Sequence, residues 1–143
     1  MRICVFLAAI VVLGEYAPLS SASVAGRESV QASELGAKWG IEVESVRLAG
    51  AEMMLDFRYR VIDPEKADLL FSRQVQPCLI HQASGVKLRV ASTAKTGPLR
   101  TTYRPQAGRI YFMLFGNTRR QVSVGDRVTV MVGDFKAENL RVE

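Results

Sequence analysis

The sequence predicts an all-β, immunoglobulin-like two-sheet antiparallel sandwich of about seven strands, with one short helix. From Trp39 onward, apolar residues recur at every second position in several short runs, which is the period of half-buried strands. Turn-forming residues separate these runs, and a helical pattern is confined to residues 63–71. A small β-barrel is the main structural alternative, because it needs the same strands.

Residues 1–25 have the features of a signal peptide. A basic residue follows the initial methionine, and the apolar run ICVFLAAIVVLG is shorter than the roughly 20 residues that span a bilayer. Small residues fit cleavage after Ala22 or Ala25, and a buried N-terminal strand is the alternative. We therefore expect a periplasmic or secreted bacterial protein that does not span the membrane, with a flexible mature N-terminus (26–38) and one β-sandwich domain (39–143).

The first two apolar runs after Trp39 predict a β-hairpin. Pairing Leu48 with Met53 leaves a four-residue loop, AGAE. A β-bulge near Glu44–Ser45 then keeps the apolar side chains of both strands on one face. The same register places Glu42 opposite Arg58 as a cross-strand ion pair.

A short helix and a second hairpin follow. Residues 63–71 begin with Asp63 as N-cap, Pro64 at the first helical position and Glu65 in the first turn. The hairpin at 77–90 turns at ASG, and its expected register pairs Ile80 with Leu88. That register turns Cys78 inward, places Leu79 on the outer face and sets His81 outward beside Lys87.

The strand IYFMLF (110–115) is apolar on both faces. We expect one alternate set, Ile110, Phe112 and Leu114, to face the core. The other set would form an exposed apolar surface of the kind that marks an interface. Its members are Tyr111, Met113 and Phe115, extended by Met131. Cover by another part of the same chain is the alternative interpretation.

The long polar segment 91–108 is the second feature that favours binding. It contains Lys95, Arg100, Tyr103 and Arg104, a basic group with one aromatic residue that suits an acidic protein or a polyanion of the envelope. A solvated loop without function is the alternative. Nucleic acid is not an expected partner, because the chain shows no platform of stacking aromatic residues.

Catalytic and metal chemistry find little support in the residue types. Cys78 and His81 are the only cysteine and the only histidine after residue 25, whereas structural zinc needs four ligands and blue copper needs two histidines. Residues three apart on a strand point to opposite faces. We therefore predict no catalytic residue, no metal ligand and no cofactor.

Three segments, WGIEVESVRL, MLDFRYRVIDPEKA and VGDFKAENLRVE, resemble a largely uncharacterised family of small exported bacterial proteins with an immunoglobulin-like β-sandwich domain. The resemblance extends from Trp39 to Glu143. It implies an exported β-sandwich and brings no catalytic residue with it.

Together these observations predict an exported, non-enzymatic binding or accessory module that engages an envelope or secreted protein, or an anionic envelope polymer. Two alternatives stay open. One is a small periplasmic metal-handling protein for copper or zinc, or a stress protein, that uses methionine or the lone thiol. The other is an enzyme of unknown type.

Overall fold

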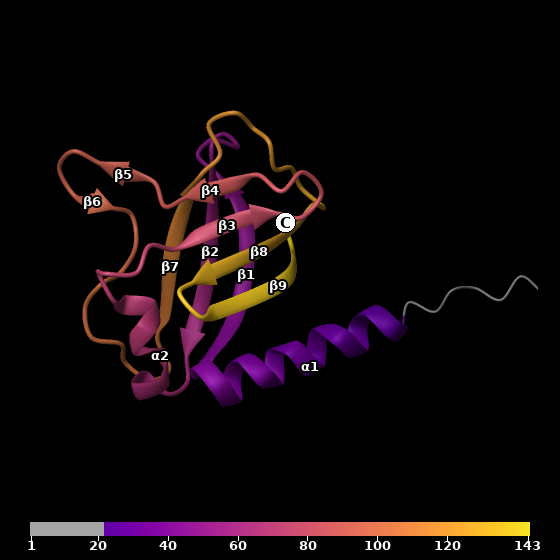
Figure 1. Ribbon diagram of the computed structural model, residues 1–143, viewed down its shortest axis with the longest axis vertical. Helices are drawn as coiled ribbons and strands as arrows, with labels where there is room; N and C mark the ends of the chain where they lie inside the picture. Colours follow the sequence, from indigo (N-terminus) through magenta and orange to yellow (C-terminus); the bar gives the residue numbers. More distant parts are fainter. Residues whose placement is uncertain (1–21) are drawn as a thin grey trace, which may run out of the picture.

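The computed structural model describes residues 22–143, with side chains described from residue 30 onward. The chain is mostly β, with two antiparallel sheets of three and four strands and two helices, so the prediction of a β-rich fold is confirmed. The elements (Figure 1) are, in chain order, α1 (Ala22–Trp39), β1 (Ile41–Ala49), β2 (Met54–Val61), α2 (Pro64–Phe71), β3 (Cys78–His81), β4 (Lys87–Arg89), β5 (Ser92–Thr93), β6 (Gly97–Pro98), β7 (Ile110–Gly116), β8 (Arg127–Val132) and β9 (Phe135–Arg141).

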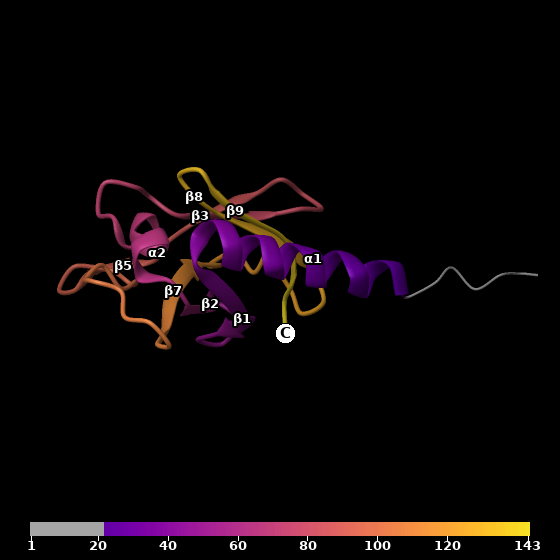
Figure 2. The same cartoon turned by 90° about the horizontal axis from the view of Figure 1, so that it is seen from below.

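The two main sheets lie one above the other as two layers (Figure 2). The strand order is β1-β2-β7 in the first sheet and β4-β3-β8-β9 in the second, and β5 and β6 form a separate two-stranded ribbon. Isolated bridges join the layers at both edges: Val90 pairs with Phe115, and Val46 pairs in parallel with Val142. The sheets therefore enclose the core from opposite sides and meet at their margins.

The β1–β2 hairpin contains the predicted bulge but uses a different register. The register shifts between Val43 and Ser45, yet Leu48 pairs with Leu55 and Glu42 with Arg60, two residues beyond the expected partners. Because side chains alternate along a strand, a shift of two residues keeps every side chain on its predicted face. The prediction of the buried face is therefore confirmed, whereas that of the pairing is wrong.

The β3–β4 hairpin is shifted by one residue, and this inverts the faces of β3, whereas β4 keeps its predicted faces with Leu88 buried and Lys87 exposed. Ile80 pairs with Lys87 instead of Leu88, because Gly85 N–H donates to His81 O at 2.8 Å and closes a four-residue loop where three residues were expected. Relative to β4, the one-residue slip moves each side chain of β3 to the opposite face. As a result Leu79 and His81 are buried and Cys78 is half-buried on the outer face, so the predicted orientations are wrong.

Strand β7 also faces the opposite way from the prediction. Tyr111, Met113 and Phe115 are at most 3% exposed, whereas Ile110 and Phe112 are exposed by 48% and 43%. The reason lies in β2, whose buried residues Leu55, Phe57 and Tyr59 stand directly opposite the three buried positions of β7. Cross-strand partners share a face, so the buried side of β2 determines which side of β7 is buried.

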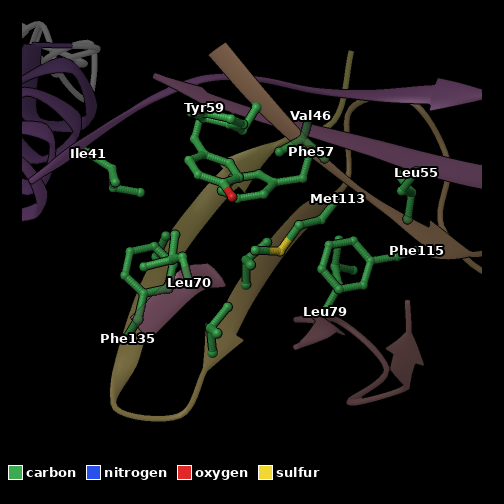
Figure 3. Packing of buried hydrophobic residues seen from close by; sticks show 14 of the residues in the cluster. Ile41, Val46, Leu55, Phe57, Tyr59, Leu70, Leu79, Met113, Phe115 and Phe135 are labelled. Carbon is green, nitrogen blue, oxygen red and sulfur yellow. The ribbon is translucent and has the colours of Figure 1, made fainter. Parts of the chain in front are cut away.

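Large aromatic side chains fill the space between the sheets (Figure 3). The rings of Phe57 and Tyr59 stack with centroids 5.4 Å apart, and Phe71 of α2 meets Tyr111 edge to face at 4.8 Å. Helix α2 starts as predicted, because the Asp63 side chain accepts hydrogen bonds from the first-turn N–H groups and Pro64 occupies an N-terminal position. This helix closes one end of the core.

The segment 26–38, which we expected to be flexible, instead lies within helix α1. Leu35 is buried and the Trp39 ring packs edge to face on Phe135 at 5.8 Å, while the N-terminal half of α1 extends past the sheets (Figures 1 and 2). The expected signal peptide lies outside the described residues except for its last four, which begin α1. In the described part of the chain, neither helix has the length and apolar character that a membrane crossing requires.

Candidate functional site

The outward side chains of the four-stranded sheet form a surface that we call the basic face. The strand registers bring together residues from the hairpin 78–89 and from the C-terminal strands β8 and β9. The sheet lies toward the viewer in Figure 1, with no helix in front of it. Its five basic side chains are Lys87, Arg89, Arg127, Lys136 and Arg141. Its one acidic side chain, among the described residues of these strands, is Glu138.

An apolar strip runs along the middle of the basic face. Cys78 and Ile80 on β3 are half-buried, as is Met131 on β8, which pairs with Cys78. Thr129 lies opposite Ile80 and accepts a hydrogen bond from Gln82 Nε2 at 3.0 Å. The strip is therefore flanked by positive charge on the β4 side and on the β9 side.

The basic side chains differ in how they are held. Lys136 forms an ion pair with Glu138, and Arg127 Nη1 donates to Asn139 O at 2.7 Å. Within residues 30–143, no acidic side chain forms an ion pair with Lys87, Arg89 or Arg141. These three are therefore available to an anion from solution.

The outer face of the three-stranded sheet has balanced charge. Arg58 Nε lies 2.8 Å from Asp56 Oδ2, and Arg60 Nε donates to Glu44 Oε1 at 2.7 Å, which raises the pKa of that guanidinium. Beside these pairs, β7 exposes Ile110 and Phe112. This face therefore offers apolar contact without an excess of either charge, and the excess positive charge of the two sheets lies on the basic face.

Half of the eight residues that the sequence predicted for partner binding have other roles. Tyr111, Met113 and Phe115 are in the core, so the prediction that they form an exposed apolar surface is wrong. Only Met131 lies on the basic face, where it is half-buried.

Arg100 is a structural residue. Its Nη2 atom donates to Ser72 O at 2.7 Å and to Val75 O at 2.8 Å. Burial lowers the pKa of the guanidinium, and the nearby Tyr59 opposes that shift. Burial also raises the pKa of the Tyr59 hydroxyl. The guanidinium therefore fastens the segment after α2 to the body of the protein.

The other members of the basic loop are exposed but spread out. Lys95 lies in the turn between β5 and β6, which projects from the body in Figure 1. Tyr103 lies edge to face with Tyr111 at 6.5 Å. Arg104 borders a shallow depression whose other side is formed by Pro64, Glu65 and Asp68 of α2. The structure therefore does not gather the loop residues into one site.

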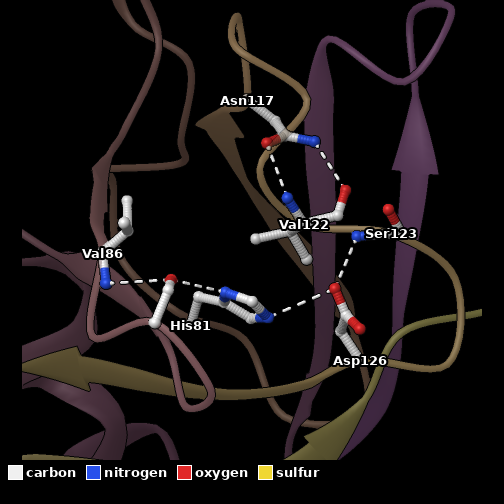
Figure 4. A network of polar contacts seen from close by, with 7 residues as sticks. His81, Val86, Asn117, Val122, Ser123 and Asp126 are labelled. Atoms are coloured by element: carbon white, nitrogen blue, oxygen red, sulfur yellow. Dashed lines mark hydrogen bonds and ion pairs between the residues drawn. The ribbon is translucent and has the colours of Figure 1, made fainter.

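His81 belongs to a polar network that the sequence analysis missed (Figure 4). Its Nδ1 atom lies 2.7 Å from Ser84 Oγ, and Nε2 lies 3.2 Å from Asp126 Oδ2. Asp126 also accepts from Ser123 N–H at 2.8 Å. This network was missed because the register predicted for the β3–β4 hairpin is one residue out. The observed register turns His81 inward, toward the segment between β7 and β8.

Asn117 holds the same segment from its other end. Asn117 is 1% exposed, and its Nδ2 atom donates to Glu52 O and Val122 O at 2.9 Å each. Its Oδ1 atom accepts from Val122 N–H at 3.2 Å. Together with His81, this side chain fixes residues 117–126 against both sheets.

The Ser84–His81–Asp126 chain has the residue types of a catalytic triad. The backbone geometry suits a structural role better, because Gly85 N–H already donates to His81 O and Val86 N–H is directed at Ser84 Oγ. Those donors are not free to stabilise an oxyanion. In the part of the chain that the structure describes, no three His, Cys, Asp or Glu side chains come together as a metal site.

Comparison of the chain with models of protein families, with curated proteins and with solved structures finds no match.

Proposed function

We propose that this chain is an exported, non-enzymatic binding module with an immunoglobulin-like sandwich fold, and that it binds an acidic protein through the basic face. The observation on which the proposal rests is the uneven charge of the two sheets. Five basic and one acidic side chain share the outer face of β4-β3-β8-β9, whereas three acidic and three basic side chains share the outer face of the other sheet. Such a surface attracts anionic partners and speeds their association.

The strand order supports the immunoglobulin-like part of the proposal. Leaving aside the β5–β6 ribbon, the first, second and fifth strands share one sheet, and the third, sixth and seventh share the other. This is the distribution of the A, B, E and C, F, G strands in an immunoglobulin domain. The fourth strand pairs with the third, as an additional strand does in the variable-type sheets.

The residue types of the basic face favour a protein over a nucleic acid. Its centre consists of Cys78, Ile80 and Met131, which provide apolar contact area and no aromatic ring on which a base could stack. A centre of low polarity surrounded by charge is the usual anatomy of a protein interface.

Reversing two charges on β4 tests the proposal. We expect the double variant Lys87→Glu and Arg89→Glu to bind poly-L-glutamate at low salt at least about tenfold more weakly, because two attractive contacts become repulsive. Binding is measured by isothermal titration calorimetry. The matched control is Lys95→Glu with Arg104→Glu, which makes the same charge change on the exposed loop and is expected to reduce affinity only about twofold. Equal losses in the two double variants would assign the binding to total charge and contradict the proposal.

The non-enzymatic part of the proposal has its own test. We expect wild-type protein and Ser84→Ala to hydrolyse p-nitrophenyl acetate at the same slow rate, because the backbone N–H groups next to Ser84 are already engaged. The variant should fold, since it loses only the two hydrogen bonds of Ser84 Oγ, with His81 Nδ1 and Val86 N–H, each worth about 1 kcal/mol. A burst of nitrophenol that disappears in Ser84→Ala would show an acyl-enzyme and overturn this part.

A further inference from the structure

Four of the five basic side chains of the basic face stand in two rows at opposite edges of the sheet, and the fifth, Arg127, lies on the central strand β8. Lys87 and Arg89 form the row on β4, and Lys136 and Arg141 form the row on β9. The apolar strip lies between the rows, on the two central strands β3 and β8. A partner that uses the whole face must therefore present acidic groups on two sides and an apolar surface between them.

The spacing of the two rows fits one kind of secondary structure. The strands β4 and β9 are the outer members of a four-stranded sheet, so the rows lie about 14 Å apart at roughly 4.8 Å per strand. An α-helix with its side chains is about 10–12 Å wide, so a helix laid on the strip lies between the rows. A single extended strand is too narrow to reach both.

The spacing along the β4 row suits a helix as well. Lys87 and Arg89 are two residues apart on one strand, which is about 6.7 Å. Acidic residues at positions i and i+4 of a helix are about 6 Å apart, so two such residues can face the row together. The helix axis would then run along the strands, with its apolar stripe on Ile80 and Met131.

We infer that the element bound by the basic face is an acidic amphipathic α-helix of the partner protein, an inference that rests on the proposed function above. One flank of the helix meets Lys87 and Arg89, and the other meets Arg141. Glu138 already pairs with Lys136, so acidic groups on that flank compete with Glu138 for the ammonium group. A second copy of this chain is a poor occupant of the face, because two basic faces repel each other.

Three synthetic peptides of about 20 residues each, long enough to form a helix in contact with a surface, test the inference. The first carries leucine at i, i+3, i+4 and i+7 with glutamate on both flanks. The second has the same composition in a scrambled order, and the third is oligoglutamate of equal net charge. We expect the amphipathic peptide to bind at least about tenfold more tightly than the other two and to gain helical circular dichroism on binding.

Variants of the strip separate the helix from charge alone. We expect Ile80→Ser and, independently, Met131→Gln to weaken binding of the amphipathic peptide about fivefold or more, with binding of oligoglutamate unchanged. Unfolding curves of both variants establish that they are folded. Equal affinity for all three peptides, or strip variants without effect, would overturn the helix and leave the proposed function standing. Failure of all three peptides to bind would overturn the proposed function itself.

Discussion

Replacing Phe115 with alanine is expected to lower the free energy of unfolding by about 3–5 kcal/mol. The Phe115 side chain is fully buried on β7 opposite Leu55. The backbone of Phe115 also forms a β-bridge with Val90, the residue after β4 of the other sheet. Removal of the side chain leaves a cavity where the two layers meet, and the surrounding strands can collapse only in part. Because a domain of this size is typically stable by about 5–15 kcal/mol, urea unfolding followed by circular dichroism should show a large shift of the midpoint.

The matched control is Phe112→Ala on the same strand. Phe112 is 43% exposed and faces away from the core, so its replacement should change the free energy of unfolding by less than about 1 kcal/mol. The pair tests the orientation of β7 directly, because the residue type and the strand are the same. A larger loss for Phe112→Ala than for Phe115→Ala would show that β7 faces the other way and would return Tyr111 and Met113 to the surface.

The orientation of β7 could not be predicted from its own residues. The run IYFMLF is apolar at every position, so a period of two divides it into two equally apolar sets. The structure selects one set through β2, where apolar and charged residues do alternate. The information that orients β7 is therefore located about 50 residues earlier in the chain, and it becomes useful only once the β2–β7 pairing is known.

The two hairpins show why the candidate site escaped prediction. The error of two residues in β1–β2 preserved every face, whereas the error of one residue in β3–β4 inverted Cys78 and His81. Loop length decides between these outcomes, and the closing contact from Gly85 to His81 is formed by backbone atoms that residue types do not reveal. The basic face combines β4 with β9, so it too depends on sheet order rather than on local pattern.

Helix α1 was missed for a related reason. The segment GRESVQASELGAK is polar and has no apolar stripe, and Leu35 is its buried side chain among those described. Contacts with β1 and β9 supply what the local pattern lacks, as is usual for a helix whose stability comes from tertiary packing. The cap of α2, by contrast, is local in sequence, and Asp63 and Pro64 were sufficient to predict where that helix starts.

Replacing Arg100 with methionine is expected to lower the free energy of unfolding by about 1–3 kcal/mol, because two partly buried carbonyls lose their donor. The guanidinium is the donor to Ser72 O and Val75 O, at 2.7 and 2.8 Å, and it lies within 3.5 Å of Leu70 O. Methionine keeps most of the apolar stem of arginine, so the loss reports the hydrogen bonds rather than packing. Lysine at this position offers one ammonium group in place of the planar fork and should recover only part of the loss.

Arg104→Met provides the comparison that separates this structural role from binding. Arg104 is exposed, so its replacement should leave the free energy of unfolding within about 0.5 kcal/mol of the wild-type value. Chemical unfolding and poly-L-glutamate binding are measured on both variants. If Arg100→Met unfolded like the wild type but bound poly-L-glutamate more weakly, Arg100 would be a surface contact. The expected result is the reverse, because Nη2 of Arg100 already donates to the two carbonyls that follow α2. We therefore assign the binding of poly-L-glutamate to Lys87, Arg89 and Arg141.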